Sequence, residues 1–140
     1  MRLNMKSVPC IIPVIMGLLV TASFAQETGK KERVRIGSSA VCTGIKDREP
    51  VGVDSAFGAD VGSLYCCTVI EGAKDATHVT HVWYYGEKKM AEISLAVKAA
   101  RWRTHSIKKI LPSQTGKWNV VILSESGDPL GQVSFTIKPQ

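Results

Sequence analysis

The 140-residue chain lacks several signatures that identify common protein classes. Aromatic residues make up only 6% of it. No stretch of ten or more residues carries apolar side chains at helical spacing, so we do not expect helices to form the core. The sequence has no Gly-x-Ser-x-Gly motif, no internal repeat and no nucleic-acid-binding motif. These absences argue against a serine hydrolase, a repeat protein and a nucleic-acid partner.

The amino terminus has the three parts of a secretory signal peptide. Arg2 and Lys6 supply positive charge, residues 11–20 form an apolar run, and residues 21–25 are mostly small. That run is shorter than the roughly 20 residues that span a bilayer, and no other segment could cross a membrane. We therefore predict a cleaved signal peptide over residues 1–25.

Cleavage is expected between Ala25 and Gln26, which places the protein in the periplasm or outside the cell. Residues 26–33 are polar and are predicted to be a disordered lead-in. Residues 34–140 then form one domain of ordinary size. This mature chain would hold 16 basic and 12 acidic residues, a net charge of +4. Such a balance permits binding to anionic envelope polymers or lipid surfaces.

The predicted domain consists of short apolar segments separated by turn residues, a pattern typical of strands. Trp83 and Trp118 suit the core of a sandwich. Alanines make 91–100 the one helical contender, but Ile93, Leu95 and Val97 alternate as in a strand. We predict an all-β fold, an antiparallel immunoglobulin-like β-sandwich of about seven strands, with a small barrel as the alternative. The expected strands cover residues 34–45, 64–70, 79–85, 90–97, 101–107, 117–123 and 131–138.

Three cysteines follow the predicted signal peptide: Cys42, Cys66 and Cys67. In an oxidising compartment a disulfide is the default expectation. Cys66 and Cys67 are neighbours, and in a strand their side chains point to opposite faces. Cys42 is therefore expected to pair with one of them, and the remaining cysteine to be a small buried apolar group.

Metal and catalytic sites have weak support in this sequence. His78 and His81 are three residues apart, and on a strand such residues face opposite ways, so one ion could not bind both. A thiol dyad of Cys66 or Cys67 with a histidine lacks a Gly-rich elbow around either cysteine. The acidic residues between 47 and 60 alternate with basic ones and fit a solvated loop better than a calcium site. We expect no metal and no cofactor.

The most suggestive residues are basic and aromatic side chains of two predicted strands. In the segment 101–107, alternation places Arg101, Arg103 and His105 on one face, and Trp102, Thr104 and Ser106 on the other. Aromatic faces beside guanidinium groups suit a sugar, a peptide or an anionic polymer. The alternative is that Trp83 and Trp102 belong to the core and the arginines cover their edges.

The chain resembles an exported bacterial family known only as domain-of-unknown-function family 2914, over about residues 34–137. The landmarks are Cys42, the segments 47–50 and 62–68, and the motifs His81-x-Trp83-Tyr84-Tyr85, Arg101-Trp102-Arg103-Thr104-x-Ser106 and Gly116-x-Trp118.

The family has no assigned catalytic activity, so the resemblance supplies none to expect of this chain. An aromatic residue often occupies the position of Cys67 in such sequences, which implies a Cys42–Cys66 disulfide. The family motifs also mark positions of interest for ligand binding, namely Arg48, His81, Trp83, Arg101, Trp102, Arg103 and Ser106.

These observations lead to one functional hypothesis and two alternatives. We expect a non-catalytic binding or structural module of the cell envelope, whose partner is an envelope polymer or protein. The alternative is a hydrolase acting on an envelope polymer, which would require His81, Glu92 and a cysteine to converge within hydrogen-bond reach. The third hypothesis is a purely structural module in a larger assembly, with an open sheet edge to which another strand could be added.

Overall fold

The computed structural model describes residues 34–140, and these residues form ten strands and no helix. The predicted signal peptide, its cleavage position and the lead-in lie outside the described residues. None of the described residues forms a helix long and apolar enough to span a bilayer. The strands are β1 (Arg35–Cys42), β2 (Gly44–Lys46), β3 (Glu49–Val51), β4 (Ala56–Gly58), β5 (Ser63–Glu71), β6 (Thr77–Tyr85), β7 (Lys88–Val97), β8 (Arg101–Lys109), β9 (Gly116–Leu123) and β10 (Pro129–Lys138).

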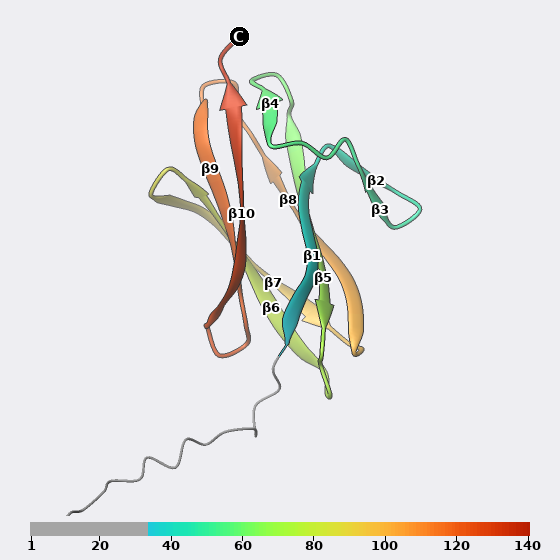
Figure 1. The fold of residues 1–140 in the computed structure, drawn as a ribbon. Coiled ribbons are helices and arrows are strands. Elements are labelled where there is room, and N and C mark those ends of the chain that lie inside the picture. Colours follow the sequence, from blue (N-terminus) through green and yellow to red (C-terminus); the bar gives the residue numbers. More distant parts are fainter. Residues whose placement is uncertain (1–33) are drawn as a thin grey trace, which may run out of the picture.

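Two sheets face each other and form a sandwich (Figure 1). One has three antiparallel strands in the order β1-β5-β8, and the other has five in the order β4-β10-β9-β6-β7. The short strand β4 pairs with β10 in parallel, whereas the other pairs are antiparallel. A separate hairpin of β2 and β3 projects beside β1 and β5. The predicted all-β sandwich is confirmed.

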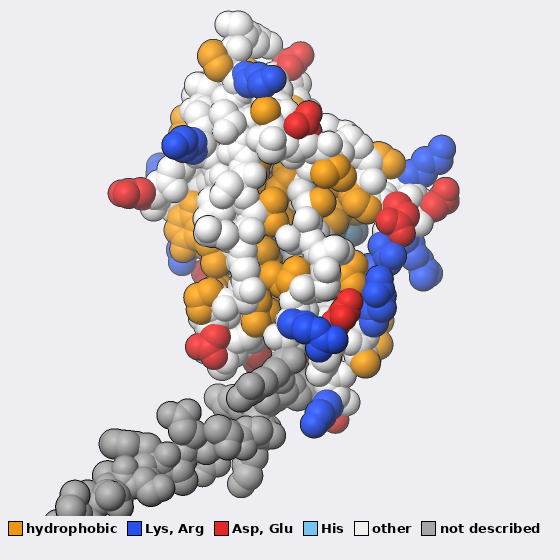
Figure 2. Space-filling view, in the orientation of Figure 1, with side chains coloured by type: hydrophobic (Ala, Val, Ile, Leu, Met, Phe, Trp, Pro, Cys, Tyr) orange, Lys and Arg blue, Asp and Glu red, His pale blue; other side chains and the backbone are white. Residues whose placement is uncertain are grey.

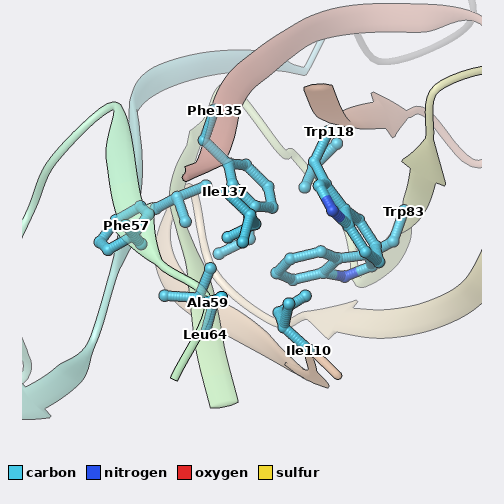
Figure 3. Packing of buried hydrophobic residues seen from close by; sticks show 11 residues of the cluster. Phe57, Ala59, Leu64, Trp83, Ile110, Trp118, Phe135 and Ile137 are labelled. Atoms are coloured by element: carbon cyan, nitrogen blue, oxygen red, sulfur yellow. The ribbon is translucent and has the colours of Figure 1, made fainter. Parts of the chain in front are cut away.

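Aromatic side chains fill the space between the two sheets (Figure 3). Trp118 and Phe135 stack with ring centroids 5.9 Å apart, and Trp83 meets Phe135 edge-on at 6.0 Å. Both tryptophans are buried, as the sequence predicted for the core. Rings in these arrangements add packing energy beyond the burial of their apolar area. This cluster fixes the separation and the alignment of the sheets.

The seven predicted strands correspond to β1 with β2, and to β5 through β10. The alanine-containing segment 91–97 is strand, with Ile93, Leu95 and Val97 on the inner face. The predicted hairpin turn between β9 and β10 is present, and the Ser124 amide donates to the Asp128 carbonyl at 2.8 Å. Strands β3 and β4 were not predicted, because three residues are too few to show an alternating pattern.

Candidate functional site

A buried polar network connects the two sheets at His81. His81 lies on the inner face of β6 and has no exposed surface. Its Nδ1 is 2.6 Å from Ser106 Oγ of β8, and its Nε2 is 3.2 Å from Thr68 Oγ1 of β5. Trp83 donates from Nε1 to the same Ser106 oxygen at 3.0 Å. Side chains from three strands therefore satisfy every polar atom of this imidazole ring.

Burial determines the charge of the imidazole in this network. The indole of Trp83 can only donate, so Ser106 Oγ accepts from it. The serine oxygen has a second lone pair, so Ser106 either donates to His81 Nδ1 or accepts from it, and Thr68 takes the complementary role at Nε2. Burial, with a smaller contribution from the charge of His105, lowers the pKa of His81 to about 4. The histidine is thus neutral at pH 7 and connects the sheets as both donor and acceptor.

Three of the predicted ligand-binding residues are therefore placed where a ligand cannot reach them. His81 and Trp83 have no exposed surface, and Ser106 is 3% exposed. Trp102 lies on the inner face of β8 as well, half-buried against the core. Expecting His81, Trp83 and Ser106 at a ligand surface was wrong, because the opposite sheet covers these side chains. The alternative reading, that Trp83 and Trp102 belong to the core, agrees with their placement.

The other predicted residues lie on the outer face of the three-stranded sheet. Arg101, Arg103 and His105 alternate on the exposed side of β8, as their spacing predicted. The side chains of Arg101 and Arg103 are 60% and 41% exposed. Neighbouring arginines on one strand face are about 7 Å apart along the strand. This face therefore presents separate cations to solvent rather than one concentrated point of charge.

The hairpin of β2 and β3 brings Arg48 to this face. Asp47 and Arg48 form its two-residue turn, with φ angles of 51° and 67°. Positive φ at both positions is the geometry that right-twisted hairpins favour, although it strains residues other than glycine. Arg103 donates to the Arg48 carbonyl oxygen at 3.4 Å and pairs with Glu49 at 3.0 Å. The hairpin is thereby attached to β8.

Glu71 of β5 organises the other end of the same face. Its carboxylate lies 3.1 Å from Arg35 of β1 and 3.6 Å from Arg101 of β8. Arg35 and Glu71 were not predicted as site residues, because their proximity to Arg101 depends on the pairing of three strands. We call the exposed set Arg35, Arg48, Arg101, Arg103 and His105 the basic face. Figure 2 shows Lys and Arg side chains, interspersed with Asp and Glu, on the side that carries β1, β5 and the hairpin.

The cysteines differ from the arrangement that the family resemblance implied. Cys66 faces the core and is fully buried, together with Val41. Cys42 and Cys67 lie on the outer side of β1 and β5, and their sulfur atoms are 3.5 Å apart. All three described cysteines are free thiols, so the expected Cys42–Cys66 bridge is absent from residues 34–140.

The structure also separates the residues that a hydrolase or a metal site would need. Glu92 lies on the outer face of β7 and pairs with Lys89 at 3.3 Å, whereas His81 faces inward. His78 points to the opposite face of β6 from His81. Within residues 34–140, no group of three or more His, Cys, Asp or Glu side chains could hold a metal ion.

A shallow groove of about 640 Å³ lies on the five-stranded sheet, and none of the predicted site residues lines it. Its walls include Asn119, Gln132 and Ser134; the Asn119 amide donates to Gln132 Oε1 and accepts from Ser134 Oγ.

The comparisons with known proteins identify a family without an assigned function. The family model described as "Protein of unknown function (DUF2914)" matches residues 76–137. The resemblance to this family is confirmed over that segment, which contains the landmarks around His81, Arg101 and Trp118. The landmarks around Cys42, Arg48 and Cys66 precede it. No curated protein matches the chain.

Solved structures of a beta-glucosidase from Listeria innocua also align with the chain. A mutant in complex with laminaribiose aligns with a TM-score of 0.42 at 9% identity, over 77% of this chain and 16% of that enzyme. The complexes with isofagomine and with glucose align with TM-scores of 0.42 and 0.41, each at 9% identity over 76% of this chain and 16% of the enzyme. The chain thus spans about a sixth of the length of these proteins.

Proposed function

We propose that this chain is a non-catalytic binding module of the cell envelope, and that it holds an acidic polysaccharide on its basic face. The observation that carries the proposal is the row of exposed arginines on the outer face of β8, extended by Arg35 and Arg48. Guanidinium groups recognise carboxylates through paired, charge-assisted hydrogen bonds. The envelope location rests on the signal-peptide pattern of residues 1–25.

The distribution of charge favours an extended polymer over a small anion. The ion pairs of this face join three arginines, Arg35, Arg101 and Arg103, to two glutamates, Glu49 and Glu71, which leaves one positive charge in surplus. Arg35 and Arg101 meet at the Glu71 carboxylate, whereas Arg103 lies farther along β8 beside Glu49. A chain with a carboxylate on each repeating unit could contact several of these arginines at once.

The ion pairs on this face do not block such binding. Each of them lies at the surface, where a pair contributes little free energy and is screened by salt. The side chain of Glu49 is 62% exposed, so the carboxylates of a polymer can compete with it for Arg103.

The titratable groups near the basic face are poorly suited to catalysis. Burial, together with the hydrogen bond and charge of Cys42, raises the pKa of Cys67 to about 12. A catalytic thiol needs the opposite shift. His81, the buried histidine, has no exposed surface for a substrate.

The test compares two double variants that remove the same charge from different faces. Arg101→Ala with Arg103→Ala removes two cations from the basic face, and Lys88→Ala with Lys89→Ala removes two from β7. Binding to polygalacturonic acid, with neutral dextran as the reference polymer, is measured by titration at low salt. Loss of two contacts of about 1 kcal/mol each predicts a Kd about 30-fold weaker for the arginine variant.

The lysine variant should bind within about threefold of the parent protein. Equal weakening in both double variants would show that net charge alone attracts the polymer, and the assignment of the face would fail. Failure of the parent protein to bind polygalacturonic acid in preference to dextran would overturn the proposed ligand class.

A further inference from the structure

The sulfur atoms of Cys42 and Cys67 are in contact on the outer side of the three-stranded sheet. Strands β1 and β5 pair in a register that places Cys42 opposite Tyr65, and Cys67 is the next residue of β5 on that same face. The two sulfur atoms are 3.5 Å apart. A disulfide bond is about 2.05 Å long, so the two sulfur atoms must move about 1.5 Å closer for the bond to form.

The third described cysteine is directed away from this pair. Cys66 is adjacent to Cys67 in β5, and alternation turns its side chain to the opposite face. It is fully buried in the core, in the cluster that contains Val41, Leu64 and Trp83. The sheet itself therefore separates the Cys66 sulfur on the inner face from the Cys42 sulfur on the outer face.

The two members of the pair differ in their access to solvent. Cys42 is fully buried, and its thiol donates to the Gly44 carbonyl oxygen at 3.1 Å, at the start of β2. Cys67 is only partly buried and pairs across the sheet with His105, which is exposed. An oxidant would therefore meet Cys67 first, with Cys42 already in position behind it.

We infer that Cys42 and Cys67 form an intramolecular disulfide in an oxidising environment, while Cys66 stays a thiol. The reaction is thiol–disulfide exchange with a protein or small-molecule disulfide. Cys67 loses its proton and attacks that disulfide, forming a mixed disulfide and releasing one thiol; its raised pKa keeps the thiolate fraction small, so this step is slow. Cys42 then loses its proton and attacks the Cys67 sulfur, which releases the second thiol. The two electrons lost by the cysteines reduce the partner disulfide to two thiols.

This bond would link the end of β1 to the central strand of its sheet. The β2–β3 hairpin begins two residues after Cys42, so the bond would anchor the base of the segment that carries Arg48. The inference depends only on the positions of the cysteines. It stands or fails independently of what the basic face binds.

Peptide mapping of the exported protein tests the pairing. The protein is unfolded in guanidinium chloride, alkylated there without reduction so that the buried Cys66 reacts, and digested with trypsin, which separates residues 36–46 from residues 49–74. The expected product is one linked pair of these peptides that carries a single alkylated cysteine. Fragmentation between Cys66 and Cys67 in the parent protein should place the link on Cys67. This measurement requires no substitution, so it cannot fail through misfolding.

Two single variants provide a matched comparison. Cys66→Ala should still give the linked peptides, and Cys67→Ser should give none. Tryptophan fluorescence reports whether each variant is folded, since Trp83 and Trp118 are buried. A link that persists in Cys67→Ser but is absent in Cys66→Ala would overturn the assignment. Recovery of unlinked peptides from the exported parent protein would overturn it as well.

Discussion

Acidification from pH 7 to pH 5 should destabilise the fold through His81. The imidazole takes up a proton near pH 6.5 in the unfolded chain, whereas its folded pKa is about 4. Between these values the unfolded state binds more protons, so the free energy of unfolding falls as the pH falls through this window. The whole difference corresponds to about 3 kcal/mol, of which about 2 kcal/mol is lost by pH 5.

Urea unfolding, followed by tryptophan fluorescence, measures this loss at a series of pH values. A His81→Gln variant keeps a polar side chain at the same position but cannot titrate. This variant should be less stable than the parent protein at pH 7. Its free energy of unfolding should not show the further decrease of about 2 kcal/mol between pH 7 and pH 5. The His78→Gln variant removes a histidine from the outer face of the same strand and serves as the control, since it should lose stability as the parent does.

Parallel pH profiles for the parent protein and His81→Gln would refute this reasoning. The same conclusion would follow if nuclear magnetic resonance found the His81 ring titrating near pH 6.5 in the folded protein. Either result would mean that the ring is charged or solvated in the fold, and that it does not connect the sheets as a neutral donor and acceptor.

Two further predictions concern the same network and the hairpin turn. Ser106→Ala leaves His81 Nδ1 and Trp83 Nε1 without partners and should lower the free energy of unfolding by about 3 kcal/mol in urea titrations. Ser94→Ala, at an exposed position, is the control and should change the free energy of unfolding by less than about 0.5 kcal/mol. Arg48→Gly relieves the left-handed backbone and should stabilise the fold by about 0.5–1 kcal/mol, while it weakens binding to polygalacturonic acid. Asp47→Gly relieves the same kind of strain without removing a cation and serves as the control. Weaker binding by Asp47→Gly would contradict the role of Arg48, and so would unchanged binding by Arg48→Gly.

Much of the secondary structure could be predicted from local pattern alone. Side chains alternate along a strand with a period of two, and that period is visible in the sequence. This period predicted, without knowledge of strand pairing, that Arg101 and Arg103 lie on one face of their strand and Ser106 on the other. It also placed Cys66 and Cys67 on opposite faces of β5. The short strands β3 and β4 escaped prediction, because the pairing that defines them comes from neighbouring segments.

The candidate site was only partly predictable, because its contacts join residues far apart in the chain. Arg103 and Arg48 are 55 residues apart, and Ser106 and His81 are 25 residues apart. A local pattern shows that a residue is exposed on a strand face, but not which strand lies beside it. For this reason the exposed arginines were predicted correctly, while His81 was assigned to a ligand surface.

The sequence by itself determined that the described chain is made of strands and which side chains share a face. Only the tertiary structure decided which faces meet. Strand order places β6 opposite β5 and β8, which buries His81 against Thr68 and Ser106. Strand register places Cys67 beside Cys42. The physical reason is that alternation follows from the geometry of one strand, whereas order and register depend on how all the apolar faces are buried together.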